Sequence, residues 1–382
     1  MKRHLRRLRR VESRVVTLEP RGESRGRALL SYILDPFLLP PGSPVPHSHT
    51  HFWESRAMGE ALRDLGFTVD VIHWTNRSFL PRHAYDLLVD VRLNLERLAP
   101  LVGPRCLKVM HIETAHRDFH NPAQERRLAD LERRRGVRLA MRRPLEPNRA
   151  IERADCATFV GNEFTASTYA FAGKRLWRVP ISQPIVYPFP EDKDWPAAAR
   201  RFVWFGSGGL VHKGLDLVLE AFAGAPELQL TVVGPIAREP DFERAFWTEL
   251  YRTPGITTIG WVDIAGARFC QVTRQAVAVV YASCSEGGGG SAITCMHAGL
   301  VPLVTREAAV DVHPAYGELL RDVSPEGVRR QARSLAERPP ADLAAMARAA
   351  WEHVRTHHTR ERFAARYREA MTEILSTCRP GP

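Results

Sequence analysis

The stretch Phe205-Gly-Ser-Gly-Gly-Leu-Val-His-Lys-Gly-Leu-Asp216 decides the fold class of this 382-residue chain. It joins an apolar segment over 201–206, typical of a buried strand, to a helix expected over 215–222. A glycine-rich turn lets the backbone approach a ligand closely, and the N–H groups of the helix start together with Lys213 attract an anion. The stretch therefore predicts a phosphate site; the alternative is a tight turn with a solvated lysine.

Two well-known phosphate motifs do not fit this stretch. A P-loop needs a glycine immediately before its lysine, but His212 precedes Lys213. The dinucleotide fingerprint needs a third glycine where Val211 stands, and no acidic residue follows the next predicted strand, which ends at Val233. The site is therefore expected to bind phosphate in a different context.

A second glycine-rich segment, Cys284-Ser-Glu-Gly-Gly-Gly-Gly-Ser291, lies between a predicted strand over 277–282 and a predicted helix start. Four consecutive glycines cost backbone entropy, and they are useful where several N–H groups converge on one ligand. The Glu286 carboxylate is suited to accept hydrogen bonds from sugar hydroxyls, because a carboxylate only accepts and hydroxyls donate. The alternative is an exposed loop whose glutamate caps the following helix.

Short apolar segments alternate with helical ones on both sides of these glycine loops, which predicts two doubly wound parallel sheets of the α/β class. Such sheets leave a cleft where the carboxyl ends of their strands face each other, and this cleft is the expected ligand site. The expected division of the chain is a basic tail over 1–26, an N-terminal domain over 27–190, a linker over 191–200, a C-terminal domain over 201–357, and a C-terminal helix over 358–382 that packs back across the domains.

The composition, with 44% hydrophobic and 25% charged residues, excludes a largely disordered chain. The net charge of +11 is local: residues 1–27 hold ten basic and three acidic side chains, and residues 117–153 hold eleven and six. We expect segments 1–26 and 117–153 to contact an anionic membrane surface; for 117–153 an anionic acceptor or a solvated helix face are the alternatives. A nucleic-acid partner is not expected, because no aromatic residues interleave with the basic ones.

Three further features concern the cellular compartment. The six cysteines are scattered without a CxxC pair, which is typical of reduced thiols. No apolar run reaches the roughly 18 residues that a membrane-spanning helix needs. The basic residues of Met1–Arg10 are not followed by an apolar core, so no secretory signal is expected. We expect a cytoplasmic protein, with peripheral contact at the inner membrane face.

Taken together, five motifs resemble the donor-binding half of retaining GT-B glycosyltransferases, the group 1 or family-4-like enzymes. They follow one another over about 100 residues: Phe205–Asp216, Leu230–Pro235, Gly260–Asp263, Ser285–Ser291 and Ala298–Val304. The N-terminal half is similar only in its strand and helix plan. The resemblance implies two Rossmann-like domains facing a central cleft, the first for the acceptor and the second for the donor.

The resemblance also implies an activity. The protein would move a sugar, of the hexosyl type, from a nucleotide-sugar donor to a glycan or lipid-linked acceptor in polysaccharide or glycolipid synthesis. Retention at the anomeric carbon without a metal is implied, no Asp-x-Asp pair follows a predicted strand, and no cofactor is expected besides the donor as co-substrate. The alternative is a catalytically degenerate GT-B protein that acts as a sugar- or nucleotide-binding module.

Residue by residue, Lys213 matches the lysine that neutralises the donor diphosphate, and Glu286 matches the first of the family's paired acids, which binds the transferred sugar. Glu286 and His111 are the implied catalytic residues, because a strand-end histidine lies over the donor sugar in the family. The implied donor-binding residues are Gly206, Ser207, Gly208, Gly209, Lys213, Gly234, Pro235, Gly260, Trp261, Gly288, Gly289, Gly290, Ser291 and Thr294.

Two positions depart from the family pattern. The arginine five residues before the lysine is Gly208 here, so one phosphate charge lacks its partner unless a basic group elsewhere compensates. The second glutamate, implied to hold the ribose hydroxyls, is Thr294 here, which leaves the nucleotide preference open.

The remaining candidates are histidines of the N-terminal half. His49 and His51 stand in the loop Pro46-His-Ser-His-Thr-His-Phe-Trp-Glu54, where the first loop of that domain would face the cleft. His116 is an alternative to His111. We expect His49, His51 and His116 on the acceptor side. Alternating histidines in a loop select no coordination geometry, so a metal site is not expected.

Overall fold

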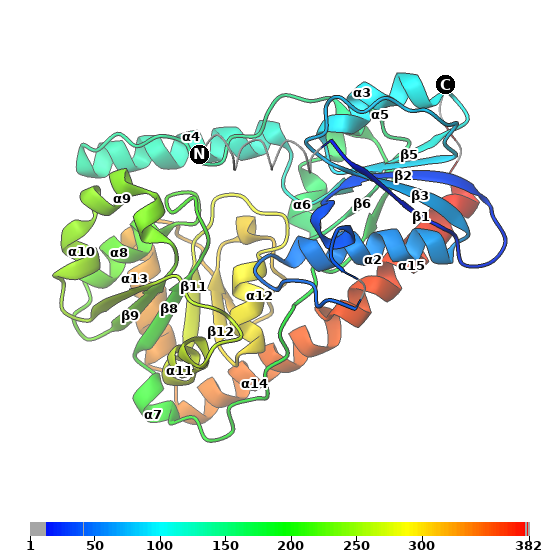
Figure 1. Cartoon of the computed structure of the whole chain (residues 1–382). Helices are drawn as coiled ribbons and strands as arrows, with labels where there is room; N and C mark the ends of the chain where they lie inside the picture. Colours follow the sequence, from blue (N-terminus) through cyan, green and yellow to red (C-terminus); the bar gives the residue numbers. More distant parts are fainter. Residues whose placement is uncertain (1–12, 41, 379, 381–382) are drawn as a thin grey trace.

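Two parallel sheets organise the chain, and the computed structural model describes residues 13–40, 42–378 and 380 of it. The described residues form a seven-stranded sheet in the order β1-β3-β2-β4-β5-β6-β7 and a six-stranded sheet in the order β10-β9-β8-β11-β12-β13. Figure 1 shows the two α/β units beside each other, joined by a few long segments. The predicted fold class, two doubly wound α/β domains, is confirmed.

The N-terminal domain contains β1 (Val15–Leu18), β2 (Gly26–Tyr32), α2 (Thr50–Asp64), β3 (Phe67–His73), β4 (Leu87–Asp90), α3 (Leu93–Val102), β5 (Leu107–Ile112), α4 (Arg117–Arg135), α5 (Ala150–Arg153), β6 (Cys156–Phe159), α6 (Glu163–Ser167) and β7 (Leu176–Arg178). Strands β2 to β7 run parallel, and β1 pairs with β3 antiparallel. The strand β1 lies inside the segment predicted as a tail, so part of that segment belongs to the sheet. Residues 1–12 of the predicted tail lie outside the described residues.

The C-terminal domain contains α7 (Trp195–Ala198), β8 (Arg201–Phe205), α8 (Leu215–Ala223), β9 (Gln229–Val233), α9 (Pro240–Ala245), α10 (Trp247–Tyr251), β10 (Ile256–Gly260), α11 (Ala267–Gln275), β11 (Ala278–Tyr281), α12 (Gly290–His297), β12 (Val301–Val304), β13 (Glu318–Leu319), α13 (Pro325–Ala336) and α14 (Pro340–His357). Its strands are nearly continuous apolar runs because helices cover both faces of a parallel sheet. One core packs α8 and α13 on the sheet, and the other packs α11 and α12.

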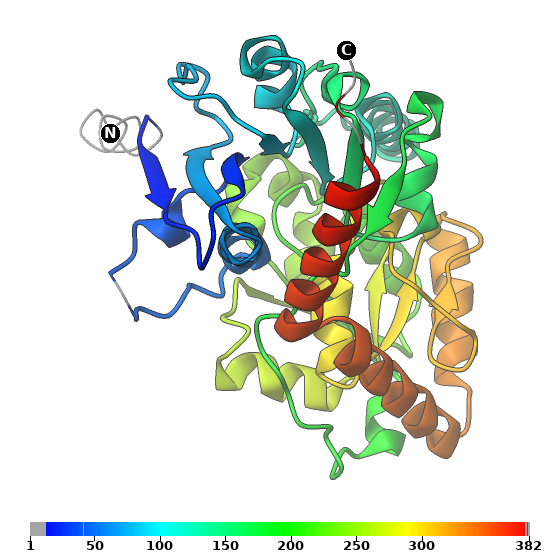
Figure 2. The same ribbon diagram turned by 90° about the vertical axis from the view of Figure 1, so that its right-hand side faces the viewer.

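The chain returns to the N-terminal domain through its last helix, α15 (Arg360–Thr377). Phe363, Tyr367 and Met371 of this helix are fully or almost fully buried in the core between α2 and the N-terminal sheet. Figure 2 shows α15 lying against the N-terminal domain and continuing from α14, which packs on the C-terminal domain. The two last helices therefore join the domains along one side of the molecule.

The helix α4 joins the domains on another side. It begins beside the N-terminal domain and runs over α8 and α9 of the C-terminal domain (Figure 1). Leu131 is fully buried in the C-terminal core, and Arg127 donates a hydrogen bond to the Ala282 carbonyl at 3.0 Å. Arg134 binds Asp216 at 2.8 Å. Several cations of the basic segment 117–153 therefore bind groups of the C-terminal domain. Neither the membrane-surface prediction nor the solvated-face alternative anticipated these contacts.

Candidate functional site: the cleft between the domains

A cleft of about 940 Å³ separates the two domains, and residues of both line it. The carboxyl ends of β8 and β11 carry the two glycine loops to its C-terminal wall. Most predicted donor-binding residues lie on that wall: Gly206, Ser207, Gly208, Lys213, Gly234, Pro235, Trp261, Gly288, Gly289, Gly290, Ser291 and Thr294. Glu286 lies there too. Gly209, in the first glycine loop, and Gly260, at the end of β10, do not form part of the lining.

The first glycine loop brings Lys213 under the cleft surface. Gly214 has a φ of 73°, and a Cβ at this position would collide with the Ala282 backbone at the end of β11. The glycine after the lysine is therefore required for the loop to reach the neighbouring strand. The Lys213 side chain is 4% exposed, and its Nζ donates to the Tyr281 hydroxyl and to Glu286 Oε1, each at 2.6 Å.

Glu286 and Lys213 form a buried ion pair at the centre of the C-terminal wall. Glu286 Oε1 also accepts hydrogen bonds from Tyr281 at 2.8 Å and from Ser283 at 3.1 Å. Burial alone would raise the pKa of Glu286, but the Lys213 charge outweighs it and holds that pKa well below the ordinary value. Glu286 is therefore ionised at neutral pH. Within the described residues no donor reaches its Oε2, so this oxygen keeps its capacity for a ligand.

The second glycine loop is constrained by packing against the N-terminal domain. A Cβ at Gly287 would collide with the backbone of Glu113 and Thr114, which follow β5 of the other domain. Gly289 has a φ of 54° and caps α12. The first N–H groups of a helix have no intrahelical acceptor, so the start of α12 presents donors at the cleft wall.

The N-terminal wall carries a network of charged side chains that the sequence did not reveal as a group. His51 Nδ1 lies 2.5 Å from Glu54 Oε2, and its Nε2 lies 3.9 Å from Glu113 Oε2. Arg92 pairs with Glu113, and the Tyr32 hydroxyl donates to Glu113 at 3.0 Å. Burial would lower the pKa of His51, but Glu54 and Glu113 raise it to about 9. An imidazolium therefore faces the cleft between two carboxylates at neutral pH.

The predicted histidines occupy different positions relative to the cleft. His49 and His51 line it. His111 is fully buried beneath Tyr32, its Nδ1 bonded to Thr158 Oγ1 at 2.8 Å, and it is not part of the lining. His116 caps α4 and packs against Tyr169 and Phe171. Neither placement supports a direct contact of His111 or His116 with a ligand in the cleft.

Glu113 is the residue of the N-terminal wall that a sequence pattern could have indicated. It stands one position after the strand predicted over 106–112, at the carboxyl end of β5, where the functional residues of such sheets gather. Its own pKa is lowered to about 2, because Arg92 and His51 outweigh the effect of burial. His51 and Arg92 both have Glu113 as a partner, and no motif near either residue in the sequence predicts this contact.

The two departures from the family pattern have structural counterparts. Thr294 donates its hydroxyl to the Gly290 carbonyl at 2.8 Å, with Gln183 Oε1 at 3.0 Å, so its donor capacity is used inside the protein. Near Gly208, the cleft lining contains Arg143, whose side chain passes over Gly209, and Arg238 of the turn after β9. Trp261 is 63% exposed in the cleft lining. Asp263, two positions later in the sequence, binds His47 of the N-terminal loop at 2.8 Å.

The residues that the structure describes contain neither a cluster of metal ligands nor a helix that could span a membrane. No three His, Cys, Asp or Glu side chains of residues 13–40, 42–378 and 380 are arranged to hold a metal ion. Over the same ranges, every helix is either too short or too polar to cross a lipid bilayer.

Comparison with known proteins concerns the fold. No family model and no curated protein sequence matches the chain. Among solved structures, sucrose-phosphate synthase from Thermosynechococcus elongatus is 17% identical, with a TM-score of 0.62 over 92% of this chain and 99% of that one. HepE from Anabaena, in complex with UDP and glucose, is 13% identical, with a TM-score of 0.55 over 92% and 99%. HepE in complex with UDP-glucose gives a TM-score of 0.55 at 14% identity.

Both similar structures are matched along nearly their whole length, so the likeness includes both domains. This agrees with the two parallel sheets and with the cleft between them. The expectation that arose from the five motifs of the C-terminal half is confirmed at the level of the fold: the chain has the GT-B fold, with two Rossmann-like domains facing a central cleft.

Proposed function

We propose that the protein is a retaining glycosyltransferase that moves a sugar from a nucleotide-sugar donor to a glycan or lipid-linked acceptor. One observation carries the proposal: Lys213, Glu286 and the glycine run meet at the carboxyl ends of β8 and β11 in one large cleft. The binding of UDP-glucose by the similar HepE supports a nucleotide sugar as the donor. The hexosyl type and independence of a metal or other cofactor belong to the proposal.

In the proposed reaction, Lys213 stabilises the charge that builds up on the leaving diphosphate. An ammonium group has three donors, and two are used by Tyr281 and Glu286, which leaves the third for a phosphate oxygen. The N–H groups at the start of α12 add to this stabilisation. Glu286 Oε2 accepts hydrogen bonds from hydroxyls of the sugar as the ring becomes oxocarbenium-like. Trp261 provides an exposed ring for the nucleobase.

The first test is a screen of UDP-, GDP-, ADP- and TDP-sugars for a rise in melting temperature, because a ligand that binds only the folded state stabilises it. At least one donor is expected to raise the melting temperature by several degrees. The Glu286→Gln variant should lose the preference for the sugar nucleotide over the nucleoside diphosphate alone. If none of these donors stabilises the wild type, the proposal is wrong.

A degenerate GT-B protein that senses sugars or nucleotides is a second candidate. The hydroxyl of Thr294 is occupied inside the protein, which removes a contact that the family resemblance assigns to the ribose. Calorimetry with the donor that binds best, followed by a search for the product by mass spectrometry, separates the two functions. A sensor binds the donor without turning it over.

We also propose a cytoplasmic location with peripheral membrane contact through the basic residues of 1–26. Because β1 belongs to the sheet, the appropriate truncation removes residues 1–12 alone. The intact chain should co-sediment with anionic vesicles more strongly than the truncated one, and the difference should disappear at high salt. Equal sedimentation at low salt would exclude a role for this segment.

A further inference from the structure

The C-terminal wall of the cleft offers a diphosphate one buried cation, Lys213, and one exposed cation, Arg238 of the turn after β9. Lys213 is its buried cation, but the Glu286 carboxylate at 2.6 Å already balances it. Gly208 supplies no side chain at all. A nucleoside diphosphate carries two to three negative charges at neutral pH, and burying them without a cation is costly. With Lys213 balanced by Glu286, Arg238 alone would leave part of this charge unmatched, so a further positive group near Gly208 would stabilise the diphosphate.

Arg143 reaches this place from the segment between α4 and α5. It lines the cleft together with Gly208 and Lys213. Its aliphatic stem passes over Gly209, where an added Cβ would lie 2.7 Å from Arg143 Cδ. Gly209, with a φ of 86°, thus leaves the space through which the arginine crosses the first glycine loop.

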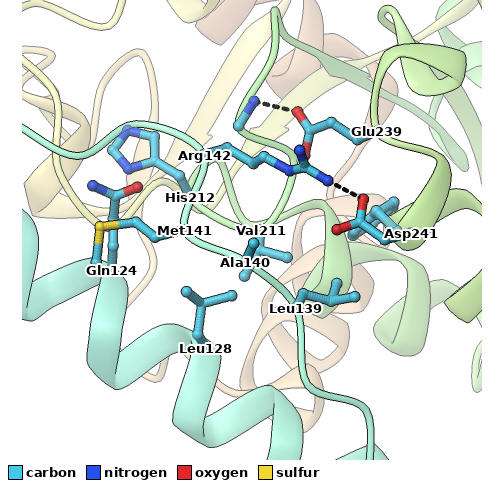
Figure 3. Close-up of a pocket in the computed structure, with 12 residues that line it drawn as sticks. Gln124, Leu128, Leu139, Ala140, Met141, Arg142, Val211, His212, Glu239 and Asp241 are labelled. Carbon is cyan, nitrogen blue, oxygen red and sulfur yellow. Dashed lines mark hydrogen bonds and ion pairs between the residues drawn. The ribbon is translucent and has the colours of Figure 1, made fainter.

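The backbone of Arg143 is held in place by α4. Its carbonyl accepts hydrogen bonds from His120 Nε2 at 2.8 Å and from Gln124 Nε2 at 2.9 Å. The His120 Nδ1 atom lies 2.9 Å from Ser285 Oγ, so the same anchor touches the second glycine loop. Figure 3 shows the neighbouring Arg142 reaching Asp241 of α9, which fixes the segment on the C-terminal domain.

Arg143 has no close ion-pair partner among the described residues, and the carboxylate whose charge reaches it, that of Glu286, already pairs with Lys213. Arg134 and Arg135 of α4, and Arg142 of the segment after it, each pair with a carboxylate of the C-terminal domain. For Arg143, in contrast, no carboxylate of the described residues lies within 4 Å of the guanidinium. Lys213 and Arg143 both line the cleft. Burial is the main cause that lowers the pKa of Lys213, Glu286 opposes it, and the charge of Arg143 adds to the lowering.

We propose that Arg143, on the segment between α4 and α5, binds the donor diphosphate and takes the place of the arginine that Gly208 lacks. The inference rests on the proposed function, because it assigns a ligand of the same site. Lys213 and Arg143 then reach the diphosphate from the same wall, because the segment that carries Arg143 is already fixed on the C-terminal domain.

The test compares Arg143→Ala with the wild type by calorimetry, using whichever of UDP, GDP, ADP and TDP binds best. We expect a loss of affinity for the diphosphate of about 10- to 100-fold, the range expected for hydrogen bonds to a charged group, while affinity for the nucleoside stays unchanged. Arg133→Ala is the matched control, since Arg133 is 74% exposed and pairs with Asp130. This control should bind as the wild type does.

A rescue variant makes the assignment specific. Gly208 does not have a positive φ, and an added Cβ would meet Glu239 Oε1 at 3.5 Å, an ordinary contact, so Gly208→Arg is sterically acceptable. When it is added to Arg143→Ala, the affinity for the diphosphate should rise above that of Arg143→Ala alone, by at least a tenth of the difference from the wild type. Unchanged diphosphate binding by Arg143→Ala, an equal loss for the nucleoside, or no rescue would each overturn the inference. A wild type that binds none of the four diphosphates would overturn the proposed function itself.

Discussion

The two walls of the cleft carry their charges in different ways. The C-terminal wall uses one ion pair, Lys213 with Glu286, held by two glycine loops that are each continuous in sequence. The N-terminal wall combines His51 and Glu54 of α2 with Arg92 and Glu113, which follow two separate strands. A site built from short loops can therefore be predicted from the sequence, whereas a site built from partners far apart in the sequence can be recognised only in the folded chain.

The largest effect is expected from breaking the ion pair of the C-terminal wall. Lys213→Met leaves the Glu286 carboxylate buried without its partner, and this costs about 3 kcal/mol of the free energy of unfolding. The double variant Lys213→Met with Glu286→Gln removes both charges and should recover at least half of that loss. Urea denaturation of the three proteins measures the difference.

An equal stability of the single and the double variant would contradict the ion pair as the feature that organises this wall. The double variant is also useful in its own right. It should fold like the wild type while lacking both groups assigned to the donor, so it separates loss of function from loss of structure.

How much of each wall could be predicted depends on whether its residues lie close together in the sequence. The glycines and Lys213 act through backbone geometry and helix-start N–H groups, which a short stretch of sequence specifies. The placement of His111 was not predicted, because burial under Tyr32 depends on the packing of α15 from the other end of the chain. The arginines of 117–153 were assigned to a surface, because the acids that pair with them lie about 100 residues away in sequence.

Gly287 is a point where the backbones of the two walls touch, so a substitution there tests how the walls depend on each other. A Cβ there would collide with the Glu113 and Thr114 backbone of the opposite domain. We expect Gly287→Ala to lower the melting temperature by several degrees, as overpacking of about 1–3 kcal/mol does, and to widen the cleft. Differential scanning calorimetry measures the shift.

Gly288→Ala is the matched control for this substitution. Gly288 has no positive φ, and an added Cβ would meet its nearest neighbours at 3.5 Å, which is ordinary contact. It should melt close to the wild type. If the two alanine variants melted alike, the glycine run would serve flexibility in general rather than the contact between the walls.

The last effect concerns the charge network of the N-terminal wall and depends on pH. The pKa of His51 is raised from 6.5 to about 9 on folding, so its contribution to stability is complete below about pH 6.5 and is lost as the pH rises through 9. The difference in unfolding free energy between wild type and His51→Gln should shrink by up to ~3 kcal/mol between pH 6.5 and 10. Urea denaturation at several pH values measures it.

The control for this series is His83→Gln, which changes an exposed histidine away from the network. It should follow the wild type at every pH. A difference between wild type and His51→Gln that stays constant from pH 6.5 to 10 would mean that His51 carries no charge between Glu54 and Glu113.

The central claim, that the cleft transfers a sugar from a nucleotide donor, is tested most directly by the release of nucleoside diphosphate. The wild type and the Lys213→Met/Glu286→Gln double variant are incubated with UDP-, GDP-, ADP- and TDP-sugars, with water in the place of the acceptor. We expect the wild type to release nucleoside diphosphate from at least one donor, and the folded double variant to do so at a rate at least 100-fold lower. Equal rates for the two proteins, or no release from any donor, would contradict it.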